Sequence, residues 1–164
     1  MEKTPAVKKH PFFEGMSNDH LEEILEVHHV KSFEAGETVI AEGEPANECY
    51  LVLKGKIHVL TEKFESHEDE RPELIPIQIL GPGQLLGWSW LVPPHKWSMT
   101  AEAVEPSEVL VLDGEKIRQK CEKDPALGFD LLKRIIAVMS ERLLLTRLHL
   151  ALHDGQPFDQ CEGG

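Results

Sequence analysis

The stretch that decides the fold is residues 36–60, GETVIAEGEPANECYLVLKGKIHVL. In it, runs rich in β-branched, aliphatic and aromatic residues, such as 37–40 and 50–53, alternate with single glycines at Gly43 and Gly55. Short runs bounded by glycine are typical of strands joined by turns. The stretch therefore predicts antiparallel strands, most simply paired as hairpins.

The β pattern continues on the C-terminal side of this stretch. Residues 75–79 place isoleucine at every second position, and residues 108–112 form another β-branched run. Residues 62–73, just before the isoleucines, hold six acidic side chains and one lone Phe64. This composition buries little apolar surface, so we expect a solvated hairpin tip there.

Helical patterns flank the β region on both sides. Ser17 suits an N-cap, and the apolar residues after it recur at helical spacing, which predicts a helix over about 17–29. The helical period returns from Ile117, which predicts a short hinge helix near 117–123, and the proline-free run 127–153 predicts the longest helix. We expect one domain over residues 1–153, with a β region at about 33–113, a hinge and long helix at about 114–153, and a tail at 154–164.

The predicted long helix carries two apolar seams. The first consists of Leu131, Ile135, Val138, Leu145 and Leu152, and the second of Ile136, Met139, Leu143, Thr146 and Leu150. A helix needs only one face to pack on its own domain. The second seam has coiled-coil spacing and predicts a homodimer about a two-fold axis. The alternative is a helix sunk deeper in its own core.

The composition limits the partners. Seventeen basic residues against 29 acidic ones give a net charge of -12, which repels nucleic acid and anionic membrane surfaces. The three cysteines are widely spaced, as expected of reduced thiols in the cytoplasm. No signal peptide or run of membrane-spanning length is evident. We therefore expect a cytoplasmic protein with no DNA and no membrane among its partners.

Three motifs carry a resemblance to a known family. They are PFFEGMS at 11–17, the glycine-punctuated pattern at 36–59, and GPGQLLG at 81–87. Together they resemble the cyclic-nucleotide-binding domain family, found in catabolite activator-like regulators, kinase regulatory subunits and gated channels. The resemblance implies a mainly β fold with flanking helices: a jelly-roll-like, double-stranded β-roll, a short N-terminal helix and a long C-terminal dimerisation helix.

The family's phosphate-binding cassette departs from its pattern in this chain. In the family it reads Phe-Gly-Glu-x-Ala-Leu, followed by an arginine; the glutamate holds the ribose 2′-hydroxyl and the arginine pairs with the cyclic phosphate. With Gly87 and Ala101 kept in place, Trp88 takes the glutamate position and Trp97 the arginine position. The resemblance therefore implies that cyclic AMP is not bound in the usual way.

The altered cassette still offers candidate ligand-binding residues. These are Gly87, Trp88, Ser89, Trp90, His95, Lys96, Trp97 and Ser98. Backbone N–H groups from Gly87 to Ser89 would begin a short helix, as in the family, and could hold an anion. Trp88 and Trp97 form either an aromatic wall that stacks a flat ligand or a plug that fills the old pocket. No cofactor is required, and a cyclic nucleotide or other nucleotide-like ligand stays open.

Catalytic and metal chemistry find little support in the sequence. No Gly-x-Ser-x-Gly, Walker-type or His-Glu-x-x-His pattern occurs, so no catalytic residues are assigned and we expect no enzymatic role. His149 and His153 are spaced like helical metal ligands but lack a third ligand fixed beside them, so no metal site is expected. Because the sequence ends at Gly164, we expect no counterpart of the winged helix-turn-helix that follows in the family's transcription factors.

Two functions remain open at this level. In the first, a nucleotide-like or aromatic anion enters the cassette, the short hinge helix shifts and the long helix re-docks. In the second, the domain is a ligand-free interaction module or accessory subunit of a larger complex, such as an oxidoreductase. Both make the protein a non-enzymatic regulatory domain that acts through an unidentified protein partner.

Overall fold

The computed structural model describes residues 7–62 and 74–153. It divides into two compact units, residues 1–129 and 130–164, each considered by itself below. Most of the predicted acidic hairpin tip, from residue 63 to 73, and the predicted tail at 154–164 lie outside the described residues. The β-roll predicted from the sequence lies wholly in the first unit.

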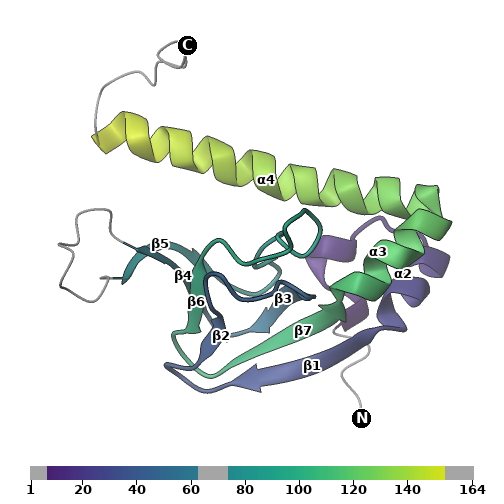
Figure 1. Ribbon diagram of the computed structural model, residues 1–164, viewed down its shortest axis with the longest axis horizontal. Coiled ribbons are helices and arrows are strands. Elements are labelled where there is room, and N and C mark those ends of the chain that lie inside the picture. Colours follow the sequence, from purple (N-terminus) through teal and green to yellow (C-terminus); the bar gives the residue numbers. More distant parts are fainter. Residues whose placement is uncertain (1–6, 63–73, 154–164) are drawn as a thin grey trace. The chain divides into compact units, whose positions relative to one another are not determined.

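Two antiparallel sheets make up the β-roll of the first unit (Figure 1). The three-stranded sheet has the order β1-β7-β3, and the four-stranded sheet has the order β2-β6-β4-β5. The strands are β1 (His28–Phe33), β2 (Thr38–Ile40), β3 (Glu48–Lys54), β4 (Ile57–Glu62), β5 (Leu74–Leu80), β6 (Thr100–Ala103) and β7 (Ser107–Asp113). The mainly β fold with flanking helices is confirmed.

The hairpin prediction holds for β4 and β5 but is wrong for the two connections within residues 36–60, because β3 lies in a different sheet from both β2 and β4. Strands β4 and β5 pair antiparallel, as predicted. Strands β3 and β4 do not pair, although only Gly55 and Lys56 link them, because they belong to different sheets. Gly55 has φ +86°, and a Cβ there would lie 2.2 Å from Ser107 Oγ. The glycine therefore turns the chain from one sheet into the other beside the start of β7.

The first predicted helix ends earlier than its sequence pattern indicates. Helix α2 spans Asn18–Leu25, and Ser17 caps it by accepting a hydrogen bond from the His20 N–H at 3.2 Å. The predicted extension to residue 29 is wrong, because residues 28 and 29 begin β1 and pair with the end of β7. A single 3₁₀ turn, η1 (Pro11–Phe13), precedes α2.

Aliphatic side chains from both sheets fill the core of the first unit. Leu51 of β3, Ile57 of β4 and Leu110 of β7 are fully buried. By contrast, the isoleucines of β5 are exposed. Alternate residues of a strand point to opposite faces, so these isoleucines occupy the outer face of an edge strand.

Two helices follow the β-roll: α3 (Gly114–Lys123) and α4 (Pro125–His153). On α4, Leu131 and Ile135 of the first predicted seam are buried, but Leu145 and Leu152 are exposed, so that seam is only half right. All members of the second seam are exposed in the described chain. None of the described helices is both long and apolar enough to span a membrane.

Candidate functional site

The cassette segment, residues 85–98, is anchored to β3 at its start and to a turn at its end. The Leu86 N–H donates to the Tyr50 carbonyl at 2.9 Å, and Leu85 forms a β-bridge with Leu51. At the other end, Lys96 forms a bridge with Pro45. The segment therefore begins and ends at fixed points of the β-roll.

The middle of the cassette is a turn where a short helix was predicted. The Leu91 N–H donates to the Trp88 carbonyl at 2.9 Å, and no helix is assigned between residues 85 and 98. The prediction of a short helix at the cassette start is therefore wrong. The Gly87 carbonyl accepts a hydrogen bond from Trp90 Nε1 at 3.2 Å. The tryptophan at the family's alanine position thus folds back over the cassette glycine.

Trp97 is packed inside the cassette. Its side chain is 5% exposed, and its ring centroid lies 6.0 Å from that of Tyr50. Its backbone is held on both sides, because its N–H donates to the Glu44 carbonyl at 3.0 Å and its carbonyl accepts from the Gly43 N–H at 2.8 Å. A Cβ built on Gly87 would approach Trp97 Cζ3 to 3.1 Å. The indole therefore covers the cassette glycine and would have to shift slightly to admit a side chain there.

The other candidate residues differ widely in exposure. Trp90 is fully buried, whereas Trp88 is partly exposed. Ser89 and His95 are also partly exposed, and Lys96 and Ser98 are exposed. His95 has φ 54°, an unusual left-handed conformation for a residue other than glycine. The structure thus brings Gly87, Trp90 and Trp97 together. The polar candidates Ser89, His95, Lys96 and Ser98 are partly or fully exposed.

Tyr50 places a neutral hydroxyl beside the buried indole. Burial raises the pKa of Tyr50 well above its ordinary value, and the hydrogen bond to Glu48 adds to this effect. The protonated hydroxyl donates to the Glu48 carboxylate. Neither Trp97 nor Tyr50 carries a positive charge, so this pair of rings offers no cation to a phosphate.

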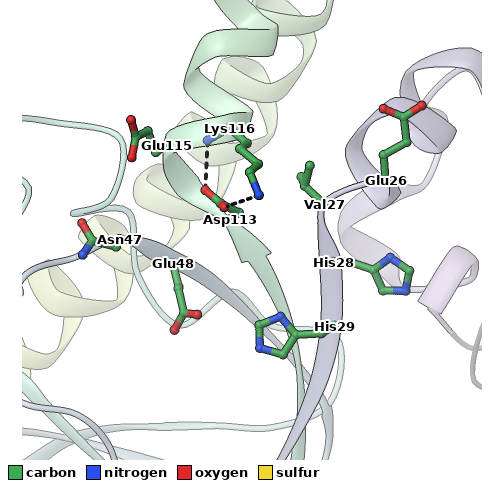
Figure 2. A pocket seen from close by; sticks show the side chains of 9 residues that line it. All are labelled: Glu26, Val27, His28, His29, Asn47, Glu48, Asp113, Glu115 and Lys116. Atoms are coloured by element: carbon green, nitrogen blue, oxygen red, sulfur yellow. Dashed lines mark hydrogen bonds and ion pairs between the residues drawn. The ribbon is translucent and has the colours of Figure 1, made fainter.

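A second, polar cavity of about 510 Å³ lies elsewhere in the first unit, where α2, β1, β3 and α3 meet (Figure 2). Its lining residues are Glu26, Val27, His28, His29, Asn47, Glu48, Asp113, Glu115 and Lys116. The one ammonium group, on Lys116, is paired with Asp113 at 3.1 Å. This excess of carboxylates disfavours a phosphate. No metal-binding group of three His, Cys, Asp or Glu side chains occurs among the described residues.

The sequence did not single out three residues that organise the cassette. Tyr50 packs on Trp97, Arg118 of α3 donates to the Trp90 carbonyl, and Gly114 faces the Trp90 ring. A glycine in the first turn of a predicted helix was the one available signal for Gly114. Nothing local in the sequence distinguishes Arg118 from the other cations of α3.

Comparison with known proteins agrees with the β-roll fold. A family model described as "Cyclic nucleotide-binding domain" matches residues 30–124. The cyclic AMP receptor protein of Thermus thermophilus is 26% identical over 146 residues, which cover 89% of this chain and 63% of that protein. A CRP-like cAMP-activated global transcriptional regulator of Mycobacterium tuberculosis is 27% identical over 119 residues, 73% of this chain and 49% of the regulator. The chain thus spans less than two thirds of either relative.

The fold is also found among solved structures. A cyclic nucleotide-binding domain from Methylobacillus flagellatus superposes with a TM-score of 0.73 at 18% identity, covering 96% of this chain and 83% of that one. At this level of identity the match speaks for the fold alone.

Proposed function

The chain belongs to the cyclic nucleotide-binding domain family, and we propose that it is a non-enzymatic regulatory domain whose cassette is filled by its own Trp97. In this proposal the domain does not bind cyclic AMP in the usual way. It acts through contact with another protein, as a ligand-free interaction module or accessory subunit.

The observation that carries the proposal is the position of Trp97. The family resemblance places this residue where an arginine would pair with the cyclic phosphate. Here the indole is 5% exposed, packs on Tyr50 and covers Gly87. Large aromatic side chains in such settings are more often core than binding platforms. This favours the plug over the stacking wall.

The energetic cost of the two replacements supports the same conclusion. A hydrogen bond to a charged group contributes roughly 1.5 to 3 kcal/mol, so losing the arginine and the ribose acceptor removes on the order of 4 to 6 kcal/mol. A micromolar site, near -8 kcal/mol, would fall to about millimolar or weaker. Such a site would stay empty at ordinary nucleotide concentrations.

The proposal includes a homodimer formed through α4. The second seam exposes Ile136 by 57%, Leu143 by 51% and Leu150 by 47%. Aliphatic side chains at coiled-coil spacing that are exposed in a single chain favour a helical partner. A second copy is the simplest partner, because a parallel pair brings each seam against its own equivalent.

Tryptophan fluorescence and calorimetry test the proposal, because all three tryptophans lie between residues 88 and 97. We would titrate cyclic AMP, cyclic GMP, cyclic dinucleotides and nicotinamide nucleotides. We expect no saturable response to about millimolar concentration, where a real binder would be stabilised by ~2.7 kcal/mol at a hundredfold excess over Kd. Saturable binding of cyclic AMP to the unaltered protein would overturn the proposal.

A gain-of-function variant sharpens this test. Trp88→Glu combined with Trp97→Arg restores both ligand-contacting side chains of the family pattern, and calorimetry should detect cyclic AMP binding. The matched control is Trp88→Gln with Trp97→Met, which also opens the cassette but adds no charge. Binding by the first variant and not by the second would show that the indole and the missing charges keep the nucleotide out.

A further inference from the structure

The C-terminal part of α4 carries more leucines than one seam needs. Six of the ten residues from 143 to 152 are leucine, and only two of them, Leu143 and Leu150, belong to the second seam. The other four, which we call the outer stripe, are each more than half exposed: Leu144, Leu145, Leu148 and Leu152. A helix that is apolar on more than one face is ordinarily covered on more than one face.

The outer stripe lies on the side of α4 that points away from the second seam. When the second seam supplies positions a and d of a heptad, the outer stripe falls at positions b, c and f. In a two-stranded coiled coil these positions face away from the partner helix and are ordinarily polar. A homodimer through the second seam would therefore not cover the outer stripe.

Arginines flank the outer stripe on both edges. Because a helix turns by about 100° per residue, Arg147 lies along one edge and Arg142 along the other. Between residues 140 and 153 the sequence holds a single carboxylate, Glu141. This part of the chain is therefore locally basic, although the whole chain has a net charge of -12.

A second copy of α4 does not suit the outer stripe. With an arginine on each edge, two stripes placed face to face would bring arginine against arginine, whether the helices run parallel or antiparallel. Like charges held side by side disfavour such a pair. A helix with leucines on one face and carboxylates along both edges would instead place a negative charge against each arginine. The charge pattern therefore favours an acidic helix from a different protein.

An anionic membrane is the other surface that suits leucines flanked by arginines. A helix that lies in a membrane interface has a strongly polar face opposite its apolar one. Opposite the outer stripe, α4 instead carries the second seam, whose Ile136 and Leu143 are exposed. Two opposite apolar faces favour a place within a helix bundle over a place on a membrane.

We propose that the outer stripe of α4 is a docking surface for an acidic amphipathic helix of the protein partner. The partner helix packs its leucines on the outer stripe and pairs its carboxylates with Arg142 and Arg147. Each α4 of the dimer then binds one partner helix. The inference deepens the proposed function and rests on it in taking the domain to act through another protein.

Fluorescence anisotropy of a labelled synthetic helix tests the surface on the full chain. The probe is a peptide of about 20 residues, long enough to be helical, with a leucine stripe and glutamates along both edges. It should bind the unaltered protein at micromolar concentration, although both carry net negative charge. Leu148→Gln removes one leucine of the outer stripe, and Arg147→Glu reverses the charge of one edge. Each should weaken binding by about tenfold or more.

Lys123→Glu is the matched control for the overall charge. It changes the net charge by the same amount as Arg147→Glu, but at an exposed position on α3, and should leave probe binding unchanged. Absence of probe binding to the unaltered protein would overturn the docking surface. So would binding that Leu148→Gln or Arg147→Glu leaves unchanged, or a loss in Lys123→Glu as large as that in Arg147→Glu.

Two further measurements separate this surface from a dimer interface and from a membrane site. In multi-angle light scattering, Leu148→Gln should keep the oligomeric state of the unaltered protein; a change to monomer would assign the outer stripe to the dimer and overturn the proposal. Sedimentation with vesicles of phosphatidylcholine and phosphatidylserine that depends on Leu148 would also overturn it. Failure of the docking surface is distinct from failure of the proposed function, because the second is read from cyclic AMP binding to the unaltered protein.

Discussion

Trp97 lies directly over Gly87, and a methyl group on that glycine would come within 3.1 Å of Trp97 Cζ3. The indole has little freedom to retreat. Its backbone is held by hydrogen bonds to Glu44 and Gly43, and its other side meets the Tyr50 ring. A larger side chain at position 87 would therefore press on the Trp97 ring, and this contact keeps the cassette filled.

We expect Gly87→Ala to destabilise the protein by about 1–2 kcal/mol, because the added methyl overpacks a site that cannot relax freely. The change should be much smaller in a Trp97→Leu background, where the ring that it meets is gone. Urea unfolding of the four proteins in this double-mutant cycle measures the coupling. Additive effects would show that Gly87 and Trp97 do not pack as described.

Alanine substitutions at Gly55 and Gly43, when compared, separate the cost of backbone strain from the cost of a steric clash. Both have positive φ, +86° and +82°, but a Cβ at Gly55 would meet Ser107 whereas nothing lies within 4 Å of Gly43. Gly43→Ala should therefore cost only the left-handed conformation, about 1–2 kcal/mol. Gly55→Ala should cost about 3 kcal/mol or more, because it adds a clash to that strain. Equal losses in urea unfolding would contradict the close approach of Gly55 to Ser107.

Local sequence signals predicted the features that depend on local chemistry. Glycines at positions 36, 43 and 55 all adopt positive φ, Ser17 caps α2, α3 and α4 end at the predicted residues 123 and 153, and they begin three and two residues earlier than predicted. Each of these follows from the backbone preferences of a few neighbouring residues. The sheet partners do not, because a glycine turn looks the same whether the next strand pairs with the last one or enters another sheet.

The state of the cassette depends on residues far apart in the chain. Whether Trp97 forms a wall or fills a pocket depends on Tyr50, which contributes the facing ring, and on the backbone of Gly43 and Glu44. The C-terminal end of the helix predicted over 17–29 is wrong for a related reason. Residues 28–33 are mostly polar, and they become a strand only because β7 provides hydrogen-bonding partners.

His10 should make stability fall at mildly acidic pH. Its Nδ1 accepts from the Phe12 N–H at 3.2 Å, so Nε2, 3.1 Å from the Val52 oxygen, carries the proton of a neutral ring. Burial lowers the pKa of His10 below its ordinary 6.5 and outweighs the opposing effect of the Val52 carbonyl. Well above pH 6.5 the ring is neutral in both the folded and the unfolded state. As the pH falls below that value the unfolded chain binds the proton first, so the folded state loses stability.

The measurement for His10 is the free energy of unfolding between about pH 7.5 and about pH 5.5. His10→Gln has no titrating ring, so its stability should fall less over this range than that of the unaltered protein. His29→Gln removes an exposed imidazole from β1 and serves as the matched control. Parallel pH profiles for the unaltered protein and His10→Gln would rule out the buried neutral ring as the cause.

The proposed homodimer is tested by one charge on α4. Leu143 is 51% exposed and belongs to the second seam, so Leu143→Lys would place two ammonium groups near each other across a two-fold axis. Burying unpaired like charges disfavours association, and we expect a monomer in multi-angle light scattering at micromolar concentration. Leu145→Lys introduces the same charge two residues away on the other seam, where the side chain is 54% exposed. That variant should remain a dimer. Monomers from both variants, or dimers from both, would mean that the second seam does not form the interface.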